Sequence, residues 1–181
     1  MSNAVDKALA AARGLERGGL DFVAYVPSHS IAPIIDHFRT RSGHASTPRA
    51  FALAREEEAV GIIGAINLAG GHGAIVMQDN GFGNALTALA TWAVAYHLPL
   101  PILANTRGGL GEYNSMIHTF SRAVPSLLRA FDAGVFELDR RNPVEDWEAT
   151  VFEAQRHAWM THRPVVVLMD FWEASGRGDR A

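Results

Sequence analysis

The residue types with the most chemical potential lie in the segment Arg55–Asn84. Three consecutive glutamates, Glu56–Glu58, open a predicted helix of small residues, and the glycine loop Gln78–Asn84 (Gln-Asp-Asn-Gly-Phe-Gly-Asn) follows the next short apolar run. A carboxylate at a helix start and a glycine loop at a strand end can share one edge of an α/β sheet. Such edges are where α/β proteins bind cofactors.

The three glutamates cannot share one environment, because successive helix residues point about 100° apart. An ordinary acidic first turn, stabilised by the helix dipole, is one interpretation. The other is that at least one carboxylate faces the protein or a partner. A carboxyl group among apolar neighbours has a raised proton affinity and can share or shuttle a proton.

The glycine loop suggests close approach of the backbone to a ligand. We expect Gly81 and Gly83 to allow positive φ and Asn84 to cap the following helix, although a tight strand-to-helix turn would use the same residues. Leu86 stands where the third glycine of G-x-G-x-x-G belongs, and the chain has no G-x-x-x-x-G-K-[ST]. Dinucleotides and P-loop nucleotides are therefore disfavoured.

Composition restricts the class of protein. The 181 residues, 48% hydrophobic and 19% charged, suit one globular domain. The absence of cysteine excludes disulfides, thiolate metal sites and cysteine nucleophiles, and the net charge of −3 gives no reason to expect nucleic acid or an anionic membrane as a partner. With no apolar run of about 18 residues and no signal-peptide pattern, we expect a cytoplasmic protein.

Short apolar strands alternate with helical patterns along the chain. Strands are expected at 21–26, 50–54, 74–78, 101–106, 134–138 and 164–169. Helices are expected at 3–17, 31–41 (capped by Ser30), 56–69, 84–96, 121–131 and 143–161. This pattern predicts an α/β fold, a three-layer α/β/α domain with a six-stranded, mainly parallel sheet. The domain should cover residues 1–173, with 174–181 as a disordered tail.

Two of these helices, 56–69 and 84–96, carry little charge after their first turns. Helices that are apolar on nearly all sides are usually buried on all sides. A thick local core is the alternative, but it would not cover both helices in a domain of this size. We therefore expect a subunit interface and a homo- or hetero-oligomer.

An ordered series of motifs resembles a known family. The motifs are Arg55-Glu-Glu-Glu-Ala-Val-Gly61, Leu68-Ala-Gly70, Met77-Gln-Asp-Asn-Gly-Phe-Gly-Asn84, Tyr96-x-Leu-Pro99 and Arg107-Gly108. They resemble the thiamine-diphosphate-dependent decarboxylases, in particular the family of sulfopyruvate decarboxylase α subunits and the related phosphonopyruvate decarboxylases. The likeness extends from about Val26 to the last strand and is more specific for the pyrimidine-binding domain than for the substrate.

The resemblance implies roles for individual residues. Glu56, three positions before the small Ala59, would hydrogen-bond the pyrimidine ring nitrogen of thiamine diphosphate and favour the imino tautomer that deprotonates the thiazolium carbon. Glu57 and Glu58 would be first-turn charges or interface residues. The cofactor-binding residues implied are Pro27, Gln78, Asn80, Gly81, Phe82, Gly83 and Asn84, together with Glu56.

The substrate is left open by departures from the family pattern. Asp79-Asn80 and Phe82 replace the family's usual residues, and Asn114–Ser121 replaces a Gln followed by a Met-Gly pair. Sulfopyruvate is the leading substrate, and phosphonopyruvate or another 3-substituted pyruvate is the alternative. A non-catalytic thiamine-binding or assembly subunit, with Glu56 merely structural, is an alternative of a different class.

Four residues are candidates for binding the small 2-oxo acid substrate: Ser28, His29, Arg107 and His118. His29 follows the first strand, and His118 falls in the expected loop 107–120; either could protonate a carbanion or enamine. The Arg107 guanidinium could clamp a sulfonate, phosphonate or carboxylate, and the glycines after it would let the loop close as a lid. A solvated histidine and a surface ion pair are the simpler interpretations.

The resemblance also implies a missing half. The family needs a second domain whose Gly-Asp-Gly…Asn motif holds the Mg²⁺ that bridges the cofactor phosphates. The chain has no Gly-Asp-Gly, and we assign it no metal ligand. A separate β subunit should carry the diphosphate and Mg²⁺ domain, and the isolated chain should bind cofactor poorly and show no turnover.

Overall fold

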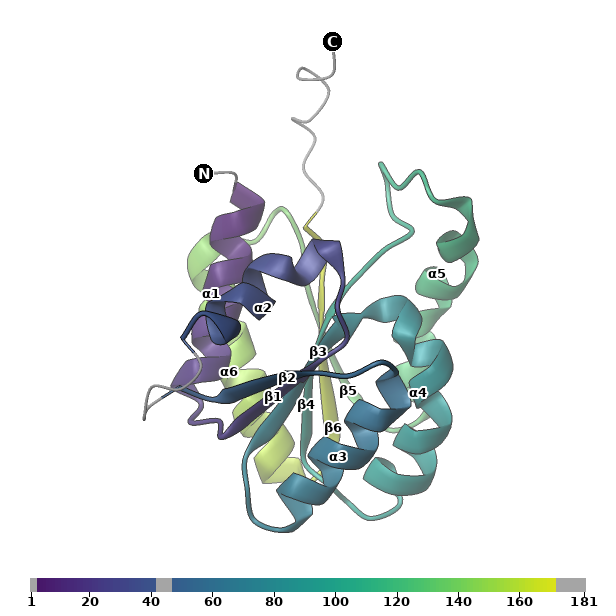
Figure 1. Cartoon of the computed structure of the whole chain (residues 1–181). Coiled ribbons are helices and arrows are strands. Elements are labelled where there is room, and N and C mark those ends of the chain that lie inside the picture. Colours follow the sequence, from purple (N-terminus) through teal and green to yellow (C-terminus); the bar gives the residue numbers. More distant parts are fainter. Residues whose placement is uncertain (1–2, 42–46, 172–181) are drawn as a thin grey trace.

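A parallel β-sheet forms the centre of the molecule. A computed structural model describes residues 3–41 and 47–171, so the expected tail 174–181 lies outside the described residues. Within them the sheet has six strands in the order β2-β1-β3-β4-β6-β5, and every neighbouring pair is parallel (Figure 1). The strands are β1 (Phe22–Tyr25), β2 (Arg49–Ala52), β3 (Gly73–Gln78), β4 (Leu100–Asn105), β5 (Gly134–Leu138) and β6 (Pro164–Met169). The predicted fold class is confirmed.

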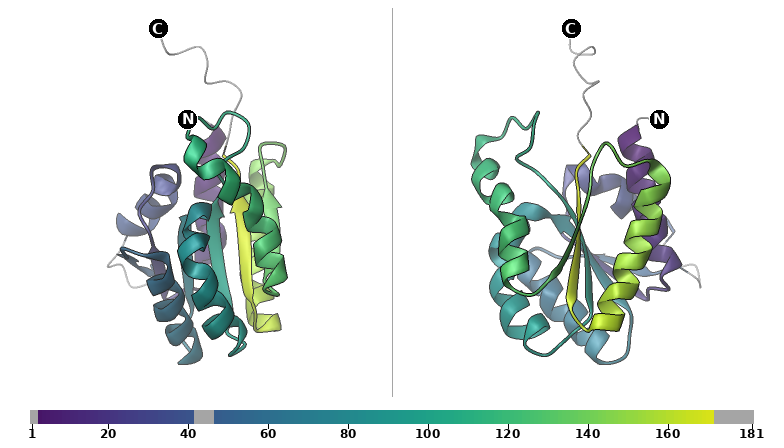
Figure 2. Two further views of the ribbon diagram at one scale, coloured as in Figure 1. Left: turned by 90° about the vertical axis from the view of Figure 1, so that its right-hand side faces the viewer. Right: turned by 180° about the vertical axis from the view of Figure 1, so that it is seen from behind.

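Helices cover both faces of this sheet (Figures 1 and 2). They are α1 (Asn3–Arg17), α2 (Ala32–Arg39), α3 (Glu56–Leu68), α4 (Phe82–Ala88), α5 (Ser115–Ala130) and α6 (Val144–Thr161). The first, second and sixth pack on one face, and the third, fourth and fifth on the other. Of the helices described, none is both long and apolar enough to cross a membrane.

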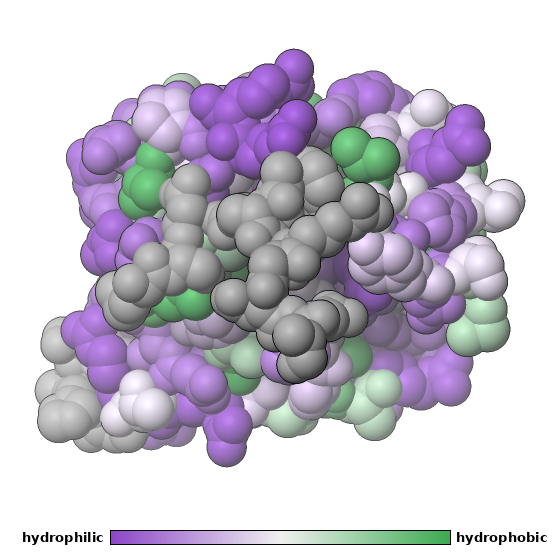
Figure 3. All heavy atoms as spheres, turned by 90° about the horizontal axis from the view of Figure 1, so that it is seen from above, coloured by the Kyte–Doolittle hydropathy of each residue, from purple (hydrophilic) through white to green (hydrophobic). Residues whose placement is uncertain are grey.

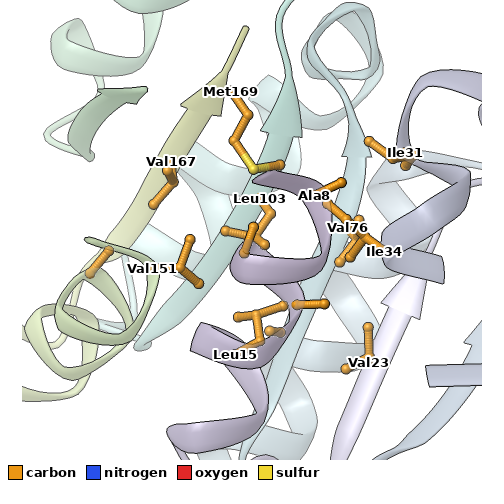
Figure 4. Packing of buried hydrophobic residues seen from close by; sticks show 14 of the residues in the cluster. Ala8, Leu15, Val23, Ile31, Ile34, Val76, Leu103, Val151, Val167 and Met169 are labelled. Atoms are coloured by element: carbon orange, nitrogen blue, oxygen red, sulfur yellow. The ribbon is translucent and has the colours of Figure 1, made fainter. Parts of the chain in front are cut away.

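Successive strand residues point to opposite faces and supply two separate cores. In β4, Leu103 packs beneath α1 and α6 (Figure 4), whereas Ile102 packs beneath the helices of the other face. Strands β3, β4 and β6 are almost entirely buried, which is why their sequences are continuous apolar runs rather than alternating ones.

The strand register brings the carboxyl ends of the central strands level. Tyr25 pairs with Val76 across β1 and β3, Gln78 pairs with Asn105 across β3 and β4, and Asn105 pairs with Met169 across β4 and β6. The residues that directly follow these strands therefore meet along one edge, the upper edge in Figure 1.

The predicted start of one helix is wrong. Helix α5 begins at Ser115, six residues before the expected position, because Asn114 accepts a hydrogen bond from the Met116 amide at 3.1 Å and caps it. Its buried stripe already starts at Ile117. The expected loop 107–120 is correspondingly shorter, and His118 lies in the helix rather than in a loop.

The expected helix 84–96 is also wrong in its details. A 3₁₀ turn, Asp79–Gly81, leads into α4, and a π-helical turn, Leu89–Val94, follows it. Asn84 therefore lies inside α4 and does not cap it. The π turn places the Trp92 indole against α3, where a Cβ on Gly64 would lie 2.5 Å from Trp92 Nε1.

The expected cap at Ser30 is likewise absent. Ser30 lies inside the 3₁₀ turn His29–Ile31, and α2 starts at Ala32 with no side-chain cap. A proline at the beginning of α2, Pro33, favours the helix start through its fixed φ.

The outer surface of α3 is partly apolar, in keeping with the expected subunit interface. The helix buries Ala59, Val60 and Ile63, yet Ile62 and Leu68 on its other side are 40% and 59% exposed. Single exposed apolar residues also occur on the surfaces of monomeric proteins, so these two do not test the interface. The oligomer itself remains a prediction.

One pair of alanine substitutions on α3 separates helix propensity from packing. Gly64→Ala should lower the free energy of unfolding by about 1–3 kcal/mol, because the new methyl group collides with the Trp92 indole. Gly61→Ala should raise it by about 0.5–1 kcal/mol, since a Cβ there meets nothing within 4 Å. Urea denaturation of both variants measures the difference, and equal effects would refute the close packing of α3 on Trp92.

Candidate functional site

The three consecutive glutamates occupy three different environments. Glu58 Oε2 accepts a hydrogen bond from the Arg55 amide at 3.2 Å and caps α3. Glu57 pairs with the Arg55 guanidinium, which lowers the pKa of Glu57. Glu56, half-buried, accepts a hydrogen bond from Asn84 Nδ2 at 2.9 Å. Only Glu56 therefore reaches the glycine loop.

Gly81 makes this contact between helix and loop possible. A Cβ on Gly81 would lie 2.3 Å from Cγ and 2.6 Å from Oε1 of Glu56, so only glycine leaves room for the carboxylate. Its φ is −61°, and Gly83 does not have positive φ either. The prediction of positive φ is therefore wrong for both glycines. The backbone at Gly81 does approach another group closely, as expected, but that group is the Glu56 side chain and not a ligand.

A second group of predicted residues meets where β1, β3 and β4 end. Gln78 Oε1 accepts a hydrogen bond from Ser28 Oγ at 3.1 Å and one from Arg107 Nη1 at 3.4 Å. Ser28 and Gln78 are 50 positions apart in sequence, and the parallel register brings them together. The Arg107 side chain is thereby directed along the carboxyl edge of the sheet.

The two candidate histidines lie in different surroundings. His29 is exposed and lines a hollow of about 500 Å³ together with Pro27, Ser28 and residues of α2. His118 lines neither that hollow nor the cavity beside Arg107. The structure therefore gives the two rings no shared position from which to donate a proton, and the choice between them stays open.

His118 ties the loop after β4 to α5. Its Nδ1 lies 2.9 Å from the Gly108 carbonyl oxygen, and its Nε2 lies 3.2 Å from the Glu112 carbonyl oxygen. A neutral imidazole carries one N–H, so donation to both carbonyls at once requires the imidazolium. In this arrangement the ring holds the loop, and its role as a proton donor stays a prediction.

Asp79 was not among the predicted site residues, although it lies at the centre of this edge. Its side chain is fully buried, and Oδ2 accepts a hydrogen bond from the Arg107 amide at 2.9 Å. Burial raises the pKa of Asp79, and the hydrogen bond from the Arg107 amide partly counters this effect. The available signal was an acidic residue directly after a strand whose one polar residue is its last, Gln78.

Glu112 is the second residue that sequence reasoning missed. Its Oε2 accepts a hydrogen bond from Arg107 Nε at 2.5 Å, and its Oε1 accepts one from the Asn114 amide at 2.9 Å. The bond from Arg107 is the main reason that the pKa of Glu112 is lowered to about 2. A lone carboxylate five residues after Arg107, in a glycine-rich loop, was the available signal.

Seen from above, the part of the surface that is not covered by grey atoms is mainly hydrophilic, with separate hydrophobic residues among the polar ones (Figure 3). Three large apolar side chains close to the Arg107 loop are strongly exposed: Leu110, Tyr113 and Met116. The site thus combines a polar edge, suited to a small charged ligand, with an apolar margin on one side.

Comparison with known proteins supports the resemblance found in the motifs. Sulfopyruvate decarboxylase subunit alpha of Methanothermobacter thermautotrophicus is 28% identical over 172 residues, which cover 93% of this chain and 99% of that protein. The protein of the same name from Methanocaldococcus jannaschii is 26% identical over 91% of this chain and 95% of its own length. The predicted resemblance to these subunits is confirmed. No protein-family model matches the chain.

Two further similarities concern longer proteins. Sulfopyruvate decarboxylase of Methanosarcina acetivorans is 32% identical over 125 residues, which are 68% of this chain but 31% of that protein. Among solved structures, a 2-oxoglutarate:ferredoxin oxidoreductase from Magnetococcus marinus, with 2-oxoglutarate, coenzyme A and succinyl-CoA bound, matches with a TM-score of 0.67 and 17% identity. The match covers 94% of this chain and 29% of that one, and it shows a shared fold.

The buried carboxyl group of Asp79 predicts how stability depends on pH. Its pKa lies above the ordinary value of 3.8, so the folded protein binds this proton more tightly than the unfolded chain does. The contribution of this proton to the free energy of unfolding is fully present below the pKa of Asp79 in the unfolded chain. It is lost as the pH rises through the pKa of Asp79 in the folded protein. Asp79→Asn resembles the protonated group, so its free energy of unfolding should increase relative to wild type as the pH is raised from about 4 towards neutrality.

Urea denaturation at several pH values within this range measures that change. Asp36→Asn is the matched control, because Asp36 is exposed and pairs only loosely with Arg39 at 3.7 Å. Its curve should run parallel to that of wild type. A parallel curve for Asp79→Asn as well would show that burial of Asp79 does not control its ionisation.

Proposed function

We propose that this chain is the α, pyrimidine-domain subunit of a thiamine-diphosphate-dependent 2-oxo acid decarboxylase. Sulfopyruvate is the leading substrate, and sulfoacetaldehyde and CO₂ are the products. The observation that carries the proposal is the position of Glu56 as the first residue of α3, held by Asn84 and packed on Gly81, in a chain similar to sulfopyruvate decarboxylase α subunits.

The residues around Glu56 fit a pyrimidine ring. Asn84 satisfies one oxygen of the carboxyl group, which leaves the other oxygen for a ring nitrogen. The glutamate is half-buried, and its Cγ lies so close to Gly81 that a Cβ there would be 2.3 Å away. A carboxyl group held in this way can share a proton with a ring nitrogen.

In this proposal each residue of the candidate site has a defined role. Thiamine diphosphate, when bound, supplies the group that accepts the electrons released with CO₂. Glu56 holds a proton at the pyrimidine nitrogen. Arg107 orients the charged groups of the substrate from the ends of β3 and β4, and Ser28 and Gln78 position its guanidinium. His29 or His118 supplies the proton that the product carbon requires.

A β subunit completes the site in this proposal. The relatives' printed name, subunit alpha, supports the existence of a partner. The partner would carry the Gly-Asp-Gly…Asn motif that this chain lacks, and with it the diphosphate and Mg²⁺ site. Exposed Ile62 and Leu68 on α3 offer it an apolar contact surface.

Arg107 does not distinguish between the possible acidic groups at C3 of the substrate. A guanidinium fork binds sulfonate, phosphonate and carboxylate with similar geometry, so Arg107 is equally compatible with phosphonopyruvate or another 3-substituted pyruvate. A panel of 3-substituted pyruvates, assayed on the complex with its β subunit, distinguishes these substrates by kcat/KM.

Substitution of Glu56 tests the catalytic proposal. In the complex with the β subunit, Glu56→Gln should lower kcat for decarboxylation by about 100-fold or more, because the amide cannot hold the proton. Glu57→Gln and Glu58→Gln should keep kcat within about threefold of wild type, since those carboxylates hydrogen-bond Arg55 rather than the glycine loop. If Glu56→Gln reacts as fast as wild type, the chain is a non-catalytic binding or assembly subunit.

Substitution of Gly81 tests the contact that aims Glu56. The Cβ of Gly81→Ala would displace the Glu56 side chain, and a misplaced catalytic group typically costs about tenfold to 100-fold in rate. Thermal unfolding should change little, because a flexible side chain can move aside. Gly61→Ala, a change of the same size with nothing within 4 Å, is the control. A wild-type rate for Gly81→Ala would refute the role of this contact.

A further inference from the structure

The guanidinium that should bind the substrate already has a carboxylate bound to it. Arg107 Nε donates to Glu112 Oε2 at 2.5 Å, and the side chains of Arg107 and Glu112 are only 28% and 12% exposed. A pair so shielded from water is screened less than a surface pair. Any anion that reaches Arg107 must therefore compete with Glu112.

Both members of the pair line one cavity. Its volume is about 210 Å³, and it lies at the ends of β4 and β6, bounded by residues 105–112, Ser30, Asp170 and Phe171. Drug-sized ligands need about 300–1,000 Å³, so a cavity of this size suits a small ligand. Substrate and Glu112 would thus meet the guanidinium in the same space.

The backbone on both sides of the pair is fixed independently of the pair. Asp79 Oδ2 accepts a hydrogen bond from the Arg107 amide at 2.9 Å, and His118 Nε2 lies 3.2 Å from the Glu112 carbonyl oxygen. The Glu112 carboxylate can therefore leave Arg107 by a change of rotamer, without unfolding the loop. The hydrogen bond that Glu112 Oε1 accepts from the Asn114 amide would keep the carboxylate near Arg107.

Protonation of Glu112 does not release Arg107 at neutral pH. The pKa of Glu112 is lowered to about 2, with the Arg107 hydrogen bond as the main cause, so the carboxylate stays charged at neutral pH. The groups that face it are Arg107 and Asn114, and Asp170 lines the same cavity. Another anion, rather than a proton, is what can displace it.

We propose that Glu112 is an internal competitor for Arg107, displaced by the anionic groups of the substrate, and that it thereby sets how tightly the site binds anions. The inference rests on the proposed function for the nature of the anion, a short dianion such as a 3-sulfonate 2-oxo acid. Because the apparent dissociation constant of any anion rises as the free fraction of Arg107 falls, an anion with low intrinsic affinity does not displace Glu112 at ordinary concentrations. A dianion that engages the fork through two oxygens replaces the carboxylate.

Calorimetric titration of the full-length chain with sulfoacetate, a stable short dianion, tests this exchange. Glu112→Gln should bind sulfoacetate about tenfold more tightly than wild type, because Arg107 is then free. The glutamine amide still offers an oxygen to the Asn114 amide. Glu148→Gln is the matched control: Glu148 pairs with Arg13 at 2.9 Å on α1 and α6, and its affinity should equal that of wild type.

A measurement on the wild-type protein separates exchange from simple charge repulsion. Saturating sulfoacetate should shift the ¹³C carboxylate resonance of Glu112 and the Nε–Hε resonance of Arg107, and should leave those of Glu148 and Arg13 in place. The proposal is overturned if Glu112→Gln binds sulfoacetate no more tightly than the wild-type protein does. It is also overturned if neither protein binds sulfoacetate. An unmoved Glu112 resonance at saturation overturns it as well.

The two proposals can fail separately. The titration measures no turnover, so it remains readable if the complex with a β subunit does not decarboxylate any 2-oxo acid. Conversely, decarboxylation that depends on Glu56 would stand even if Glu112 did not move.

Discussion

The parallel direction of all six strands is the constraint on which the site depends. A parallel sheet with helices on both faces has a dry interior, so polar side chains can gather only where the strands end. The register then decides which of them meet. Since Gln78 lies level with Asn105, and Tyr25 with Val76, the residues that follow these strands converge on one edge. Glu56 reaches the same glycine loop from the start of α3.

Polar groups at a partly buried edge need partners, and here the partners are one another. Asp79 accepts a hydrogen bond from the Arg107 amide, and the Arg107 side chain donates to Glu112 and Gln78. Gln78 also accepts a hydrogen bond from the Ser28 hydroxyl. Loss of a partner would leave a buried group unsatisfied, which costs more than the bond itself contributes. The edge is therefore largely preorganised, although Asp79 Oδ1 and Asn105 Oδ1 are buried without a hydrogen-bond partner among the described residues.

Close backbone approach lets this network fit. Gly81 leaves room for Glu56, and Gly108, at a φ of +76°, lies where a Cβ would be 3.0 Å from the His118 Cα. At Gly108 both the conformation and the contact require glycine, whereas at Gly81 only the contact does. Glycines in one site can thus serve different physical needs, which their sequence spacing does not distinguish.

The sequence by itself determined the layered fold, the strand segments and the position of Glu56 at a helix start, because these follow from local hydrophobic period and chain order. Tertiary structure alone decided that Asn84 bonds Glu56 instead of capping a helix, and that Asp79 holds the Arg107 amide. Those two outcomes depend on contacts between residues 28 positions apart in sequence, where the strand register and the burial of charge select the partner. The α5 start at Ser115 and the Arg107–Glu112 pair instead come from short-range contacts, two and five positions apart, that the hydrophobic pattern does not reveal.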